Sequence, residues 1–127
     1  MSAVTKKIRR VGLIAHDNKK PLLLDWAERN KQVLAKYELC GTGTTGALVE
    51  SKTGLKVHKY KSGPLGGDLQ IGGQIAEGLI DFLVFFWDPM FPHPHEPDVR
   101  ALLRVATVYD IPVATNRSSA DVMISAL

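Results

Sequence analysis

Residues 82–87, Phe-Leu-Val-Phe-Phe-Trp, are apolar at every position. A strand with one face in water alternates polar and apolar residues, whereas a strand covered on both faces does not. The run is also far shorter than the roughly 20 apolar residues of a membrane-spanning helix. It therefore predicts the central strand of a parallel sheet with helices on both faces.

Further strands and helices alternate along the rest of the chain. The alternation predicts a single three-layer α/β/α domain over residues 1–127, with a mainly parallel central sheet and right-handed crossovers. Residues 1–9 are expected to be a flexible tail. The other strands are expected at 11–15, 37–40, 55–60 and 111–115, and the helices at 21–34, 44–52, 68–77 and 97–108, with a last short helix capped by Ser118 or Ser119.

The composition is that of an ordinary globular protein. Of 127 residues, 45% are hydrophobic and 23% are charged, which argues against disorder or a fibrous repeat. Cys40 is the only cysteine, so no intramolecular disulfide can form and a reducing, cytoplasmic location is expected. The net charge of +3 includes a basic cluster at residues 6–10. No aromatic residues interleave with that cluster, so we expect no nucleic-acid partner. Because the longest apolar run is short, we expect no membrane partner either.

Polar segments follow each predicted strand. Ligands of parallel α/β sheets bind at the carboxyl ends of the strands, so these segments are expected to meet in one site. They lie at residues 16–17, 41–46, 62–68, 88–98 and 115–116.

Residues 41–46, Gly-Thr-Gly-Thr-Thr-Gly, match the letters of a dinucleotide-binding fingerprint. They follow the second predicted strand, however, and the next strand ends in Tyr60-Lys61 without an acid for a ribose. We therefore interpret them as a phosphate cradle that uses the hydroxyls of Thr42, Thr44 and Thr45 and the N–H groups at the helix start. The alternative is a tight turn with capping threonines.

Other candidate ligands of an anion lie near this cradle. Ser62 and Gly63 can form its second wall, or an ordinary turn. Lys20 begins a predicted helix, where a cation is unfavourable unless an anion is near, although exposed lysines are common. His16 ends a predicted buried strand, where the alternative is a hydrogen-bonded core histidine.

Asp68 directly follows Gly66 and Gly67. An aspartate at that place can cap the following helix. Beside a bound phosphate ester it can instead act as a base, because partial desolvation raises the pKa of a carboxyl group and suits it to accept a proton from carbon.

Residues 93–98, His-Pro-His-Glu-Pro-Asp, combine two imidazoles with two carboxylates. Prolines in and beside this segment favour an extended chain, so His93 and His95 are expected on opposite sides, and no metal site is predicted. We expect His95 to enter the site and polarise a substrate oxygen, His93 to remain outside, and Asp98 to orient His95.

Together these motifs resemble the methylglyoxal synthase family over nearly the whole chain. The resemblance implies a lyase that needs no metal or cofactor and converts dihydroxyacetone phosphate to methylglyoxal and inorganic phosphate. It also implies a homohexamer that phosphate inhibits. The matching motifs are residues 15–17, 41–46, 62–68, 85–89, 94–98 and 112–116.

The resemblance also implies residue roles. It makes Asp68 the catalytic base and His95 the group that polarises the carbonyl. Asp98 is the third catalytic residue, in the role of a supporting acid. Asp17 and Asp88 are further supporting acids. The implied substrate ligands are His16, Lys20, Thr42, Gly43, Thr44, Thr45, Ser62, Gly63 and His95.

Two other functions remain open on the sequence alone. The same fold resembles the regulatory domains of carbamoyl phosphate synthetase, where an anion cradle serves as a sensor without catalysis. A nucleic-acid-binding domain that uses the basic N-terminus is the other alternative. The presence of both Asp68 and His95 favours the enzyme, because a sensor needs no base.

Overall fold

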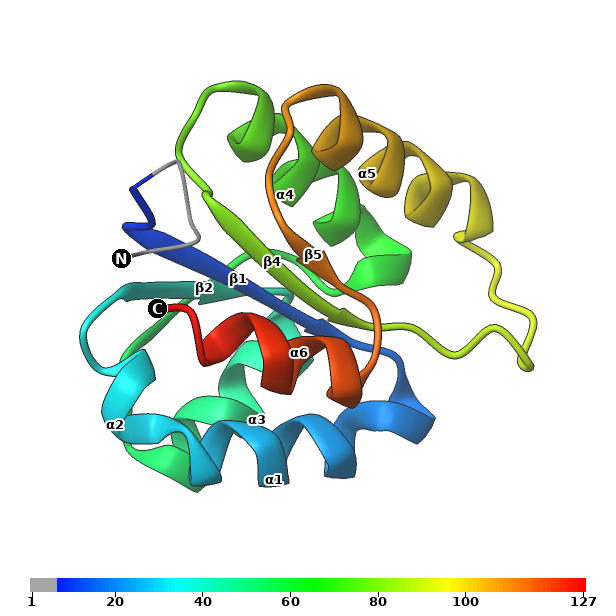
Figure 1. Ribbon diagram of the computed structural model, residues 1–127. Helices are drawn as coiled ribbons and strands as arrows, with labels where there is room; N and C mark the ends of the chain where they lie inside the picture. The colour runs from blue at the N-terminus through cyan, green and yellow to red at the C-terminus, as the bar shows by residue number, and fades with distance from the viewer. Residues whose placement is uncertain (1–6) are drawn as a thin grey trace.

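A sheet of five parallel strands forms the middle layer of the molecule (Figure 1). The structure is a computed structural model and describes residues 7–127. The strands lie side by side in the order β3-β2-β1-β4-β5. Their bounds are Arg10–Ala15 for β1, Glu38–Gly41 for β2, Val57–Lys59 for β3, Phe82–Phe86 for β4 and Val113–Ala114 for β5.

Helices cover both faces of this sheet, which confirms the three-layer α/β/α fold (Figure 1). Helices α1, α2, α3 and α6 pack on one face, and α4 and α5 pack on the other. The α-helices are α1 (Lys20–Arg29), α2 (Lys31–Leu34), α3 (Gly43–Thr53), α4 (Gly67–Ala76), α5 (Glu96–Val108) and α6 (Arg117–Ile124), and two 3₁₀ turns are η1 (Asp17–Lys19) and η2 (Gly63–Leu65).

The strand order places a change of direction beside β1. The chain steps outward from β1 to β2 and β3, then returns through α4 to β4 on the other side of β1. Right-handed crossovers require the helices to change faces when the direction changes. The loops after β1 and β4 therefore diverge, and a crevice opens at the carboxyl ends of these two strands.

Strand β4 is buried on both faces, as its sequence predicts. Phe82, Val84 and Phe86 belong to the core under α1, α3 and α6. Leu83 and Phe85 belong to the core under α4 and α5. Because β4 joins both cores, its side chains hold the two helical layers to the sheet.

The helix expected at residues 21–34 is broken at Asn30. The backbone of Asn30 has φ −112° and ψ 16°, outside the helical region. Its side-chain Nδ2 donates to the carbonyl of Trp26 at 2.8 Å. Asparagine competes for backbone hydrogen bonds in this way. Helix α1 therefore ends at Arg29, directly before Asn30.

The last helix is capped two or three residues earlier than expected. Asn116 Oδ1 accepts a hydrogen bond from the Ser119 N–H at 2.9 Å. Asn116 precedes α6 in an extended conformation, so the expected caps Ser118 and Ser119 lie inside the helix.

A flexible tail was expected at residues 1–9. Residues 1–6 of this segment lie outside the described residues. In the described part, Ile8 is buried, and the Arg9 N–H donates to Asp81 Oδ2 at 3.0 Å. Within residues 7–127, no helix is long and apolar enough to cross a membrane.

Cys40, in β2, is fully buried, and its Sγ donates to the Val11 carbonyl at 3.7 Å. Burial raises the pKa of this thiol to about 12.

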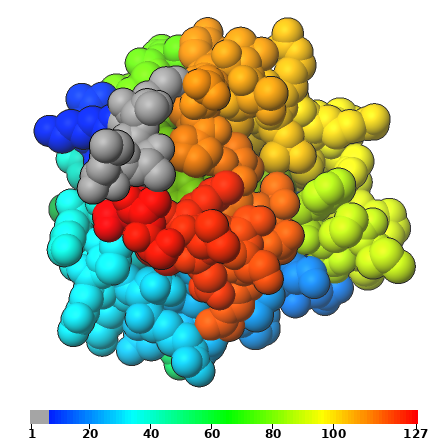
Figure 2. Space-filling model, viewed as in Figure 1, coloured from blue at the N-terminus to red at the C-terminus, as the bar shows by residue number. Residues whose placement is uncertain are grey.

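Residues 87–95, between β4 and α5, protrude from the domain and form a ledge (yellow-green in Figure 2). Met90, on this ledge, is 91% exposed, and Phe91 beside it is also exposed. The ledge has no regular secondary structure before a turn at Pro94 and His95. It therefore places its side chains through turns rather than along a helix or strand.

The core position of β4 predicts a large effect of truncation. Leu83→Ala removes a side chain with no exposed surface and should lower the free energy of unfolding by about 2–5 kcal/mol. Urea unfolding at a fixed protein concentration measures this loss. Leu79→Ala, the same change at a residue that is 43% exposed, serves as the control. Equal shifts for the two variants would contradict the role of β4.

Candidate active site

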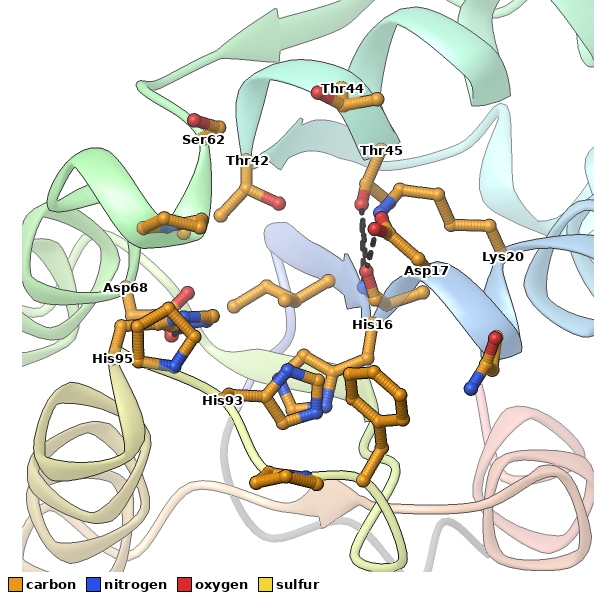
Figure 3. A pocket seen from close by; sticks show the side chains of 18 residues that line it. His16, Asp17, Lys20, Thr42, Thr44, Thr45, Ser62, Asp68, His93 and His95 are labelled. Atoms are coloured by element: carbon orange, nitrogen blue, oxygen red, sulfur yellow. Dashed lines mark hydrogen bonds and ion pairs between the residues drawn. The ribbon is translucent and has the colours of Figure 1, made fainter.

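A cavity of about 470 Å³ lies at the carboxyl ends of β1, β2 and β3, under the ledge that follows β4. Figure 3 shows side chains from four chain segments pointing toward it. Most of the site residues predicted from the sequence line this cavity. These are His16, Asp17, Lys20, Thr42, Thr44, Thr45, Ser62, Gly63, Asp68 and His95.

Asp68 is the buried acid of the cavity. It lies in the first turn of α4 but forms no capping hydrogen bond, so the capping interpretation does not hold. Its side chain is 1% exposed, and neither oxygen has a hydrogen-bond partner among the described residues. Burial raises the pKa of Asp68, and the nearby Asp98 adds to this, whereas a charged His95 would lower it. The carboxyl group is therefore an unusually strong base for an aspartate.

Glycines let the backbone turn closely around Asp68. Gly66 has φ 101°, a conformation that side chains rarely adopt. A Cβ atom at Gly67 would collide with the Lys61 carbonyl. At Gly63 a Cβ atom would stand 2.9 Å from His95 Nε2 and 3.3 Å from Asp68 Oδ1. Gly63 therefore leaves the space in which these two groups face the cavity.

His95 stands directly against Asp68. Its Nε2 is 3.6 Å from Asp68 Oδ2, and its side chain is almost fully buried. His95 precedes α5 at the N-cap position. Its Nδ1 is buried and forms no hydrogen bond within residues 7–127. One nitrogen of the ring thus faces the base, and the other is available to a bound molecule or water.

Asp98 reaches His95 through the backbone rather than through its carboxyl group. The Asp98 N–H donates to the His95 carbonyl at 2.9 Å. Asp98 is absent from the described lining of the cavity. The sequence predicted that Asp98 orients the His95 ring; the structure instead lets its charge act on the pKa of Asp68.

His16 has a tautomer that its surroundings fix. The Asp88 N–H donates to His16 Nδ1 at 3.0 Å, so the neutral ring carries its proton on Nε2. That Nε2 is buried and lacks a partner in the described chain, which leaves it as a donor for a ligand. Burial, followed by the proximity of His93 and His95, lowers the pKa of His16 to about 4.

His93 also lines the cavity, and the expectation that it stays outside is wrong. Its ring centroid is 3.7 Å from that of His16, with 32° between the planes. Alternation would separate His93 from His95 only in an extended chain, and here the Glu96 N–H turns back to the His93 carbonyl at 3.2 Å. The sequence feature that could have predicted this turn is Pro94, two residues before the start of α5.

The threonine cradle lies on the opposite side of the cavity from His16 and His93 (Figure 3). Thr42 precedes α3, and Thr44 and Thr45 lie in its first turn, where N–H groups have no partner within the helix. The Thr45 hydroxyl donates to the Ala15 carbonyl at 3.3 Å. The Gly43 N–H donates to the Lys61 carbonyl at 3.3 Å. Thr45 and Gly43 thus also tie the cradle to neighbouring segments.

Lys20 is the cationic side chain of the cavity lining. Its Nζ donates to Asp17 Oδ1 at 2.5 Å and to the Ala15 carbonyl at 3.2 Å. The hydrogen bond from Lys20 lowers the pKa of Asp17. Asp17 therefore holds the ammonium group at the end of β1.

Asp88 supports the site from behind the lining. Asp88 Oδ2 accepts from Asn18 Nδ2 at 2.9 Å, and this hydrogen bond lowers the pKa of Asp88. With its N–H on His16, Asp88 therefore connects the ends of β1 and β4.

Two other predicted features fall elsewhere. Thr115 and Asn116 do not line the cavity as the structure describes it, because Asn116 caps α6. Within residues 7–127, no group of three or more His, Cys, Asp or Glu side chains is arranged to hold a metal ion.

Comparison with known proteins identifies the family. The MGS-like domain family matches residues 22–115. A methylglyoxal synthase of Leptospira interrogans is 55% identical over 118 residues, which cover 93% of this chain and 80% of that protein. The chain belongs to the methylglyoxal synthase family.

Other members of the methylglyoxal synthase family agree with this assignment. A methylglyoxal synthase of Clostridium botulinum (strain Eklund 17B / Type B) is 57% identical over 115 residues, which cover 91% of this chain and 97% of that protein. The crystal structure of methylglyoxal synthase from Elizabethkingia anophelis NUHP1 matches with a TM-score of 0.87 and 43% identity. That match covers 93% of this chain and 78% of the other.

The environment of His16 predicts its titration. Because its pKa of about 4 in the folded protein is below the ordinary 6.5, protonation favours the unfolded chain. The contribution of His16 to stability is present above pH 6.5 and should be lost as the pH falls toward 4. NMR of the ring nitrogens should show a neutral ring with its proton on Nε2 at pH 7, with His16→Gln used for assignment. A proton on Nδ1 would contradict the predicted tautomer.

Proposed function

We propose that this protein converts dihydroxyacetone phosphate to methylglyoxal and inorganic phosphate, as a carbon–oxygen lyase acting on phosphates. The observation that carries the proposal is the buried carboxyl group of Asp68, which has no hydrogen bond among the described residues, lies 3.6 Å from His95 and lines a cavity with threonines. Family membership supports the same reaction.

The first step is removal of a proton from the carbon that bears the free hydroxyl group. Asp68 accepts this proton, and its raised pKa makes it a better base than an exposed aspartate. The electron pair of the broken C–H bond forms the carbon–carbon double bond of an enediolate. His95 and the Nε2–H of His16 are the donors that stabilise the negative oxygen.

The second step expels phosphate. The hydroxyl group on the deprotonated carbon loses its proton and becomes a carbonyl, the double bond shifts to the phosphate-bearing carbon, and the C–O bond breaks. The electron pair leaves with phosphate, which takes up a proton. The bond must stand roughly perpendicular to the enediolate plane, and Thr42, Thr44, Ser62 and Lys20 would fix that angle. The released enol then becomes methylglyoxal.

We extend the proposal to assembly and regulation. Inorganic phosphate would inhibit, because it fits the same cradle as the phosphate of the substrate. The exposed apolar side chains of Leu65, Met90 and Phe91 support a homo-oligomer, which we propose is a hexamer. We also propose that the protein acts in the cytoplasm, where the single cysteine would stay reduced.

A sensing module remains the alternative of another class. A sensor needs the threonine cradle but gains nothing from a buried carboxyl group without hydrogen bonds, which costs stability. The retained pair of Asp68 and His95 therefore favours the lyase.

Replacement of the base tests the proposed reaction. Purified wild-type protein treated with EDTA should form methylglyoxal and phosphate in equal amounts from dihydroxyacetone phosphate. Asp68→Asn should lower turnover by about 10²–10⁴-fold, because it removes the proton acceptor. The same variant should raise the melting temperature at neutral pH, since a buried charge without hydrogen bonds is lost.

Asp121→Asn, the same change at an exposed position in α6, is the control and should keep wild-type turnover. No product from wild-type protein, with phosphate still bound, would favour the sensing module. Full turnover by Asp68→Asn would show that another group is the base.

The open space at Gly63 can be tested separately. Gly63→Ala places a methyl group between His95 and Asp68 and should reduce kcat by roughly 10²-fold, because the two groups must move apart. Gly73→Ala is the matched control, since a methyl group there meets no atom within 4 Å. Steady-state kinetics of both variants compare the effects. Equal kcat values for the two would contradict the role of Gly63.

A further inference from the structure

The proposed substrate would enter a cavity whose lining has no net positive charge. Among the lining residues, Lys20 is opposed by two carboxylates, Asp17 and Asp68. With neutral imidazoles the described lining therefore carries one net negative charge. A phosphate ester brings up to two more negative charges, and like charges in a partly buried site repel strongly.

Lys20 and Asp68 cannot correct this imbalance. The ammonium group of Lys20 is already bound to Asp17 at 2.5 Å. Asp68 must be ionised to accept a proton from the substrate. The N–H groups at the start of α3 bind an anion without carrying a full charge, so the imidazoles are the remaining lining groups that can supply one.

Two of the three imidazoles are unsuited to carry it. His16 Nδ1 accepts the Asp88 N–H, so a second ring proton would oppose that N–H. A charged His95 would pair with Asp68 at 3.6 Å and weaken it as a base, because it lowers the pKa of the carboxyl group. His93 is the remaining lining imidazole. A charged His93 also lowers the pKa of Asp68, but less than a charged His95 does, and no ion pair joins His93 to Asp68 in the described residues.

The position of His93 suits a cation that faces an anion. Its ring lies 3.7 Å from the ring of His16 (Figure 3). A cation over a neutral aromatic face is attracted to it, whereas two charged rings at this distance would repel. His93 Nε2 is buried and has no hydrogen-bond partner in the part of the chain that the structure describes.

We propose that His93 takes up a proton when a phosphate-bearing ligand binds and so supplies the positive charge that the cavity lacks. The inference rests on the proposed function, since it takes this cavity to be the site of the phosphate ester. His93 would then be a further ligand-binding residue whose protonation couples affinity to pH. The titratable groups that face it are His16 after β1, Asp17 in η1, Asp68 in α4, Asp88 after β4 and His95 before α5.

Inorganic sulfate is the probe that separates protein protons from ligand protons. Sulfate has the shape and charge of the phosphate dianion, but its own charge does not change near neutral pH. Calorimetric titration of wild-type protein with sulfate should show uptake of one proton, detected as a binding enthalpy that depends on the buffer. Because one proton is taken up on binding, the Kd should rise with pH by up to about tenfold per pH unit.

His93→Gln should abolish both the proton uptake and the pH dependence, and should weaken sulfate binding at least tenfold at low pH. His58→Gln, at an exposed histidine of β3 outside the cavity, should behave as wild type. The proposal is overturned if the His93→Gln variant still takes up a proton on sulfate binding, or if sulfate does not bind to the wild type. It is also overturned if proton uptake is lost in the His95→Gln variant and kept in the His93→Gln variant. Methylglyoxal formation by the wild type, measured in parallel, shows separately whether the proposed reaction holds.

Discussion

The parallel pairing of β1 with β4 decides where the imidazoles of the site lie. The register joins Ala15 to Phe86, so both strands end at the same level and the chain leaves them in different directions. His16 follows one strand, and the ledge with His93 and His95 follows the other. A shift of this register by one residue would turn the buried side chains of β4 toward the wrong core and separate the imidazoles.

The site keeps a carboxyl group where folding alone would not place one. Asp68 is buried without hydrogen bonds, and the glycines around it let the backbone close over the carboxyl group. A buried charge without hydrogen bonds is unfavourable, so the surrounding core must offset its cost. The apolar side chains of β4, which join both helical layers, contribute to this.

The sequence predicted the sheet well because its strands are apolar runs that end in polar turns, and β4 is the clearest of them. It also located most of the cavity lining, since the carboxyl ends of parallel strands meet. It failed where local geometry overrides pattern. Asn30 breaks a helix through its own side chain, and a turn at Pro94 brings His93 into the cavity. The tautomer of His16 depends on the Asp88 N–H, a backbone contact that no sequence pattern shows.

Burial of Cys40 has a consequence for a protein whose proposed product is a reactive dicarbonyl. Such an electrophile modifies thiolates, and a thiol with a pKa of about 12 is almost entirely uncharged at neutral pH. The single cysteine of the chain is moreover closed off in β2, against the backbone of β1. The fold thus keeps its only thiol away from the compound that the neighbouring cavity would release.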